Sequence, residues 1–136
     1  MQVKPRLAAA MLLALSSISL TSCASGGDIF YFLRPPQITW NDTKWCVPLE
    51  LKLVLNQIAR KYGPVQIHST FRWPIENARK GGKPHSYHLS CRAVDFSVKG
   101  DNGQVLQYIR SHPSVGGYSR YPQGFYHIDN GPRRTW

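Results

Sequence analysis

The N-terminal leader constrains the fold of this chain more than any other feature, because it takes residues 1–22 out of the part that folds. Lys4 and Arg6 come first, and an apolar run follows over Leu7–Leu20. A charged region followed by an apolar stretch too short to span a bilayer is typical of an export signal. Of the 136 residues, about 114 then remain, which is enough for one small core but not for a second domain.

The leader ends on Leu20-Thr21-Ser22-Cys23, which resembles the bacterial lipobox. In that motif the cysteine becomes the lipidated first residue of the mature protein. The resemblance implies a membrane anchor on Cys23, and Ala24 after it implies sorting to the outer membrane. An ordinary signal cleaved nearby and a short membrane anchor are the alternatives. All three export the chain, so we expect a periplasmic protein and favour an outer-membrane lipoprotein.

The charge balance bears on the partners of the chain. It carries 17 Lys and Arg against 7 Asp and Glu, a formal net charge of +10. Such a balance favours anionic partners, including the carboxylates and phosphates of a cell envelope. Export, together with the lack of an RNA-binding signature or a basic recognition helix, argues against nucleic acid. Because the charge is scattered along the sequence, an ordinary solvated basic surface is the other interpretation.

Two cysteines follow Cys23, namely Cys46 and Cys91. In an oxidising compartment two remaining cysteines often pair. A disulfide between them would close a loop and contribute about 3–4 kcal/mol by the chain-entropy argument. The alternative, Cys91 as a nucleophile or metal ligand, is less favoured because it has no partner cysteine at short spacing.

Hydrophobic periodicity predicts the order of the elements. From Pro48 onward, apolar residues at helical spacing fall on one face of a helix that stops at Gly63. These residues are Leu51, Val54, Leu55, Ile58 and Tyr62. Later patterns predict a strand over 65–68, a loop over 72–84, a strand over 92–98, a helix over 105–111 and a hairpin over 116–119 and 124–128.

This order predicts a small α+β domain, with an antiparallel sheet and flanking helices. We expect the signal over 1–22, a lipidated tether and an extended arm over 23–47, and the folded domain over 48–136.

His88 and Asp95 lie close together in the sequence, one before and one within the strand predicted over 92–98. Both can converge on one metal ion if a third ligand comes from elsewhere, and His127 in the final hairpin is the best candidate. Two histidines and one carboxylate leave a fourth position for water, as in catalytic zinc sites. Spacing alone leaves open an ordinary hydrogen-bonded pair of His88 and Asp95.

Several segments together resemble the zinc D-Ala-D-Ala carboxypeptidase and murein endopeptidase family. The central one is Ser86-x-His88-x-x-x-x-Ala93-x-Asp95, which is similar to the family's zinc motif. The others are Ser69-Thr70-Phe71-Arg72-Trp73-Pro74 with Asn77, Gly116-Gly117-Tyr118, Phe125-Tyr126-His127-Ile128-Asp129, and Arg133 or Arg134 before Trp136. The resemblance covers Leu51–Trp136 with the motifs in the right order.

The resemblance implies the family's zinc fold and a metallopeptidase that cuts peptides of peptidoglycan, either as an endopeptidase or as a D,D- or L,D-carboxypeptidase. It implies a Zn²⁺ ion on His88, Asp95 and His127. Arg72 is expected to pair with a carboxylate of the stem peptide. Ser86 and Tyr118 are also expected near the substrate, although a tyrosine in a hairpin usually just packs.

The other histidines are weaker candidates. We expect His85, in the Pro/Gly loop, to be a bystander, with proton transfer as its alternative role. His68, on the short strand over 65–68, is expected to be a hydrogen-bonded core residue.

The sequence departs from the family pattern at two positions. Cys91 stands where the motif has glycine, a residue that usually serves a positive φ or a close approach. Gly124 stands where many relatives have an acidic general base, and Asp129 is the nearest substitute. Asp129 would either activate the attacking water or orient His127.

Two other functions stay open from the sequence. One is a catalytically inactive, zinc-containing lipoprotein that binds peptidoglycan, and the lack of an acid at Gly124 supports it. The other is a structural envelope lipoprotein without metal.

Overall fold

The computed structural model describes residues 35–101 and 103–136. The signal over 1–22, Cys23 and the tether up to residue 34 lie outside the described residues. The elements in chain order are β1 (Ile38–Trp40), α2 (Leu49–Tyr62), β2 (Val65–Ser69), α3 (Pro74–Arg79), the 3₁₀ helix η1 (Tyr87–Ser90), β3 (Ala93–Val98), α4 (Gln104–Ser111), β4 (Gly117–Arg120), β5 (Tyr126–Asp129) and β6 (Arg134–Thr135). None of the helices in these two stretches is long and apolar enough to cross a membrane.

The strands form one six-stranded sheet in the order β1-β2-β3-β5-β4-β6. The central pairs β2/β3, β3/β5 and β4/β5 are antiparallel, whereas the outer pairs β1/β2 and β4/β6 are parallel. Helix α2 contacts β1, β2 and β3, and α4 contacts both β4 and α2. The predicted α+β class is confirmed, with parallel strands added at both edges of the antiparallel centre.

Helix α2 follows from its apolar stripe. Leu51, Val54, Leu55 and Ile58 are fully buried, and they pack in the core with residues of β2, β3, β5 and α4. Pro48 precedes the first helical residue, and the acidic and basic residues of the first and last turns match the helix dipole. The helix predicted from Pro48 onward is confirmed.

Four short elements were not predicted, and one of them is η1. The loop expected over 72–84 contains α3, which begins with Pro74, a residue well suited to the first helical position. The end of the expected arm forms β1 at one edge of the sheet, and β6 forms the other edge. Each strand is two or three residues long, so each depends on non-local pairing and leaves no periodic signal in the sequence.

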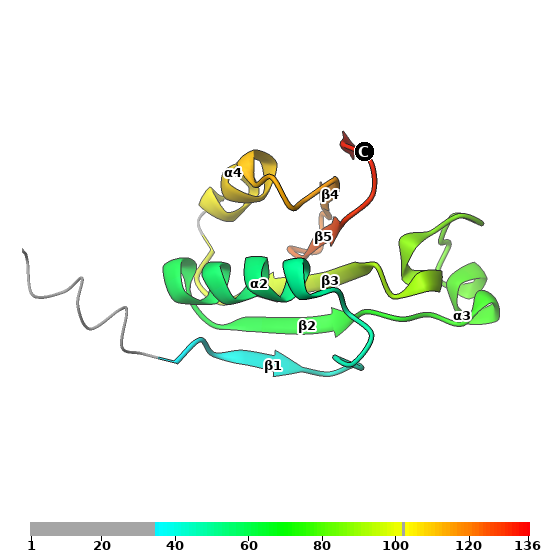
Figure 1. Ribbon diagram of the computed structural model, residues 1–136, viewed down its shortest axis with the longest axis horizontal. Helices are drawn as coiled ribbons and strands as arrows, with labels where there is room; N and C mark the ends of the chain where they lie inside the picture. Colours follow the sequence, from blue (N-terminus) through cyan, green and yellow to red (C-terminus); the bar gives the residue numbers. More distant parts are fainter. Residues whose placement is uncertain (1–34, 102) are drawn as a thin grey trace, which may run out of the picture.

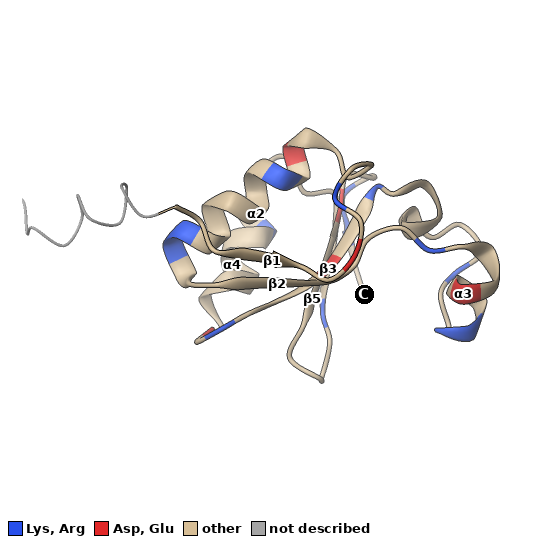
Figure 2. Ribbon diagram, turned by 90° about the horizontal axis from the view of Figure 1, so that it is seen from below, with Lys and Arg blue, Asp and Glu red and all other residues tan. Residues whose placement is uncertain are grey.

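Strand β3 is more buried than the predicted alternation implies. Every residue from Ala93 to Val98 is buried except Ser97, which is half-buried. One face packs on the helices, and on the other face Asp95 is in contact with His88, His127 and Arg72. Figure 2 shows that the positions of basic and acidic residues are spread over α2, α3 and the loops.

Candidate metal centre

His88, Asp95 and His127 come from three elements and meet on one face of the sheet. His88 lies in η1, Asp95 in the middle of β3, and His127 in β5. Asp95 and His127 are direct partners in the antiparallel register of β3 and β5, so their side chains point to the same face. All three are buried, and their potential ligand atoms all lie within 4.8 Å of one another.

The three ligand atoms form a close triangle. The Nδ1 atom of His127 lies 2.8 Å from Oδ1 of Asp95. The Nε2 atom of His88 lies 3.2 Å from the same oxygen and 3.3 Å from Nδ1 of His127. Each histidine therefore presents one defined nitrogen to the cluster, and that nitrogen differs between the two rings.

The outward nitrogen of each ring has an acceptor of its own. Nδ1 of His88 donates to the carbonyl oxygen of Thr70 at 2.6 Å, and Nε2 of His127 donates to Oδ2 of Asp129 at 3.0 Å. A carbonyl and an ionised carboxylate cannot donate, so a neutral ring carries its hydrogen on that outer nitrogen. The inner nitrogens, Nε2 of His88 and Nδ1 of His127, then direct lone pairs toward Asp95. Together with Oδ1 of Asp95 they are three acceptors that face one another, and a cation bound between them would pair with all three.

This donor set fits zinc. Two neutral imidazoles and one carboxylate, with room for a further ligand, are typical of catalytic zinc. The outer hydrogen bonds to a carbonyl and a carboxylate are those that usually fix metal-binding histidines.

The charges of the cluster shift its protonation. Burial works to raise the pKa of Asp95, but its contacts with His127 and His88 outweigh burial and hold that pKa well below its usual range. Burial works to lower the pKa of His127, but the Asp129 and Asp95 carboxylates outweigh it and raise that pKa. The site therefore holds its carboxylate ionised and attracts positive charge.

Comparison with known proteins agrees with this geometry. A sequence model of the Peptidase M15 family matches residues 35–129. The chain belongs to the peptidase M15 family.

Two curated relatives of this M15 peptidase share part of its sequence. The peptidoglycan L,D-endopeptidase MepK of Escherichia coli strain K12 is 35% identical over 79 residues, which cover 54% of this chain and 43% of that protein. The probable peptidoglycan L,D-endopeptidase MepK of Haemophilus influenzae is 37% identical over 60 residues, which cover 42% of this chain and 31% of that protein. The matched part spans less than half the length of either relative.

Asp129 of this M15 peptidase lies behind His127, on the side of the ring opposite the cluster. Burial works to raise its pKa, but hydrogen bonds from His127, the Gly131 amide and Arg134 outweigh it and lower the pKa to about 2. In the structure its Oδ2 contacts Nε2 of His127, the ring nitrogen that faces away from the cluster.

Arg72 contacts Asp95 directly. Its Nη2 atom pairs with Oδ2 of Asp95, the oxygen that does not face the histidines, and its Nε donates to Oγ of Ser69 at 2.9 Å. The guanidinium group is mostly buried, at 13% side-chain exposure. In this M15 peptidase the expected substrate-binding arginine thus also holds a candidate metal ligand.

Ser86 and Tyr118 have other contacts. The hydroxyl oxygen of Ser86 caps η1 and accepts a hydrogen bond from the His88 amide at 3.3 Å. Tyr118 is half-buried against the core, and the Arg133 guanidinium carbon lies 5.2 Å from its ring centroid. Their expected roles near the substrate stay predictions.

Cys91 ends η1 with φ 56°, in the left-handed region, and forms a disulfide with Cys46. It is the one residue other than glycine with a positive φ in the described part of the chain. The family glycine at this position therefore corresponds to a backbone conformation that this M15 peptidase keeps with a side chain present.

A cavity of about 480 Å³ lies beside the cluster and reaches Asp95. Its lining residues are His68, Ser69, Arg72, Lys80, Asp95, Ser97, Gln123 and Phe125. The expectation that His68 is a core residue is wrong: it is exposed, and its Nε2 lies 2.8 Å from Oγ of Ser97. The alternation of buried Val65 and Ile67 with exposed neighbours was the signal that could have revealed this.

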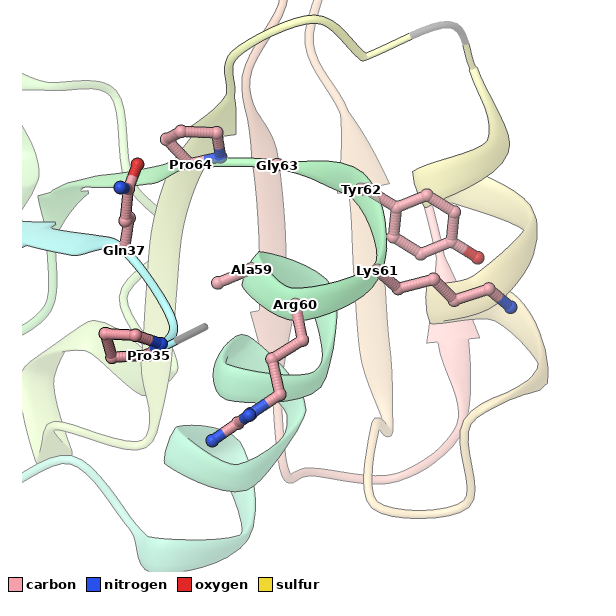
Figure 3. Close-up of a pocket in the computed structure, with 8 residues that line it drawn as sticks. All are labelled: Pro35, Gln37, Ala59, Arg60, Lys61, Tyr62, Gly63 and Pro64. Atoms are coloured by element: carbon pink, nitrogen blue, oxygen red, sulfur yellow. The ribbon is translucent and has the colours of Figure 1, made fainter. Parts of the chain in front are cut away.

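A separate hollow of about 250 Å³ lies at the C-terminal end of α2, as Figure 3 shows. It is lined by Pro35, Gln37, Ala59, Arg60, Lys61, Tyr62, Gly63 and Pro64. None of the three cluster residues belongs to it, so the cavity beside Asp95 is the better candidate for the substrate.

Proposed function

We propose that this M15 peptidase is a zinc-dependent hydrolase of peptide bonds in peptidoglycan. The observation that carries the proposal is the convergence of His88 Nε2, Asp95 Oδ1 and His127 Nδ1, three acceptors held inward by hydrogen bonds on their far sides. The family and the two MepK relatives support the reaction and the polymer. The products released from peptidoglycan will show whether the enzyme is an endopeptidase or a D,D- or L,D-carboxypeptidase.

His88, Asp95 and His127 would hold the ion. When bound, zinc polarises the scissile carbonyl and lowers the pKa of water toward about 7. The chain supplies the rest: Thr70 fixes the His88 ring, and Asp129 fixes the His127 ring. Arg72 balances the charge of Asp95 and lines the adjoining cavity.

The cavity beside Asp95 is the proposed binding site for the substrate. Arg72 and Lys80 line it, and a guanidinium group can bind a carboxylate through several donors at once. We propose that Arg72 keeps its contact with Asp95 and offers its Nη1 donor to a carboxylate of the stem peptide.

Proton transfer needs a group on the cavity side of the cluster, and Asp129 faces away from it. His68 lines the same cavity as Asp95, and histidine is the usual proton carrier near neutral pH. We therefore propose His68 as the proton carrier and Asp129 as the residue that orients His127.

For the localisation we propose export to the periplasm and a lipid anchor on Cys23, which is outside the described residues. The support is the leader sequence together with the peptidoglycan named for the relatives.

The test uses the purified full chain and purified sacculi. We expect about one zinc per chain by metal analysis, and release of muropeptides that mass spectrometry assigns to a cleaved bond. His88→Ala and Asp95→Asn should abolish both, chelation should abolish release, and zinc should restore it. His112→Ala is the matched control, because His112 is half-buried and its Nε2 contacts Oε1 of Gln57, away from the cluster.

Two results would contradict the proposal. An unchanged muropeptide profile with zinc-loaded protein would favour the inactive peptidoglycan-binding lipoprotein. Zinc binding that is absent, or unaffected by His88→Ala, would favour a structural lipoprotein.

A further inference from the structure

Arg134 forms a bidentate contact with the carboxylate of Asp129, which lies behind His127. Its Nη2 lies 2.7 Å from Oδ2 of Asp129, and its Nη1 lies 3.1 Å from Oδ1. Arg134 begins β6, which pairs with β4 at Gly117. A two-pronged contact of this kind fixes the plane of the carboxylate as well as its position.

Asp129 has three further hydrogen-bond partners besides Arg134. Its Oδ1 accepts from the amides of Gly117 at 3.0 Å and Gly131 at 2.8 Å, and its Oδ2 accepts from His127. The residue is fully buried. Of the groups that hold Asp129, Arg134 is the one that brings a full positive charge.

The space around this pair is closed. A Cβ atom on Gly117 would lie 2.3 Å from Oδ2 of Asp129 and 2.8 Å from the guanidinium carbon of Arg134. A side chain at this position would therefore force the carboxylate or the guanidinium group to move.

Arg134 also reaches the surroundings of both histidines. Its guanidinium carbon lies 4.8 Å from the ring centroid of Tyr87, the neighbour of His88, and 5.4 Å from that of Trp136. The Trp136 ring in turn packs edge-on against His127 at 4.9 Å between centroids. His127 thus contacts Trp136 through its ring and Asp129 through its Nε2 atom, and Arg134 contacts both of these residues.

We propose that Arg134 is a positioning residue of the metal centre. By holding Asp129, it keeps the hydrogen of His127 on Nε2 and the Nδ1 lone pair directed at Asp95 and His88. Without Arg134, Asp129 loses its charged partner, and the His127 ring can turn or change tautomer. The inference rests on the proposed function only in naming the metal as zinc.

Arg133 provides a matched control. It is the preceding residue, but its Nη1 binds the carbonyl oxygen of Val115 at 2.7 Å and its guanidinium group lies over Tyr118. Loss of Arg133 removes the same charge and a similar number of atoms near β6 without touching Asp129. A purely structural role for the segment would make the two arginines equivalent.

The test measures zinc affinity of the full chain by competition with a chromophoric chelator. We expect Arg134→Ala to weaken zinc binding 10- to 100-fold, the usual cost of losing an outer partner of a metal ligand. Asp129→Asn should weaken it by a similar factor, and Arg134→Lys, which keeps the charge but not the two-pronged contact, by less. Arg133→Ala should bind zinc as the wild type does.

A second measurement keeps the test decisive if Arg134→Ala folds poorly. Nitrogen NMR of the metal-free wild type should show the hydrogen of His127 on Nε2, and Arg134→Lys should show a mixture of tautomers while staying folded. Equal zinc affinity in Arg134→Ala and the wild type would overturn the proposal. So would equal losses in Arg134→Ala and Arg133→Ala, or an unchanged tautomer in Arg134→Lys.

Failure of the proposed function would give a different result from failure of the positioning role. If the wild type binds zinc but releases no muropeptides, while its affinity still depends on Arg134, the positioning role stands and the peptidase proposal falls.

Discussion

Cys46 is bonded to Cys91, the residue that ends the His88-bearing turn in a left-handed conformation with φ 56°. For a residue with a Cβ atom this conformation costs about 1–2 kcal/mol. The bond joins the segment after β1 to η1, and Cys91 itself is buried. The disulfide therefore involves Cys91, the residue of this turn whose backbone conformation is unfavourable for any residue with a side chain.

Two double variants separate the bond from the backbone conformation. Cys46→Ala/Cys91→Ala should lower the free energy of unfolding by about 3–4 kcal/mol through loss of the cross-link. Cys46→Ala/Cys91→Gly should recover about 1 kcal/mol of this, because glycine adopts the left-handed region freely. Urea unfolding of both variants measures the difference. A glycine variant that is less stable than the alanine variant would contradict the prediction.

Arg72 should affect substrates according to their charge. Arg72→Ala is expected to lower kcat/KM for stem peptides with a free terminal carboxylate about 10- to 100-fold, the worth of a hydrogen bond to a charged group. The same peptides with an amide terminus should lose much less. Arg79→Ala, an exposed arginine of α3, is the control. An equal loss for both peptides would mean that Arg72 acts only through Asp95.

His68 should affect turnover but not metal content. His68→Gln keeps a side chain that can bond to Ser97 but cannot carry a proton, so kcat should fall about 10²- to 10⁴-fold. The number of zinc ions per chain should stay that of the wild type. His85→Gln, in the exposed loop before η1, should have no such effect. A His68→Gln enzyme with wild-type kcat would mean that a group other than His68 carries the proton.

Tyr126 should make the folded state sensitive to alkali. Burial raises its pKa, and the hydrogen bond that its hydroxyl donates to Asp101 adds to the effect, bringing the pKa to about 12. The unfolded chain loses this proton first, near pH 10, so this contribution is fully present below about pH 10 and is lost as the pH rises toward about 12.

The slope should be at most about 1.4 kcal/mol per pH unit. Urea unfolding between pH 9 and pH 12 should show this slope in the wild type and a smaller one in Tyr126→Phe. The same pH dependence in both proteins would show that Tyr126 does not contribute.

Local pattern was sufficient for the parts of the fold whose signal lies within one segment. The apolar stripe from Leu51 to Ile58 predicted α2, and the β-rich run after Pro64 predicted β2. In contrast, β1 and β6 form only because they pair with β2 and β4, which lie far from them in the sequence. A strand of two or three residues has no period to detect.

The candidate site likewise has a part that the sequence could predict and a part that only the tertiary structure decided. By itself the sequence determined which side chains could meet, since His88, Asp95 and His127 stand in an ordered set of motifs. The tertiary structure decided which atoms face one another: Asp129 turned behind His127, Arg72 paired with Asp95, and His68 opened to the cavity. A strand's alternation fixes only the face on which a side chain lies. Which ring nitrogen points inward is set by acceptors such as Thr70 and Asp129, and only folding brings these beside the two rings.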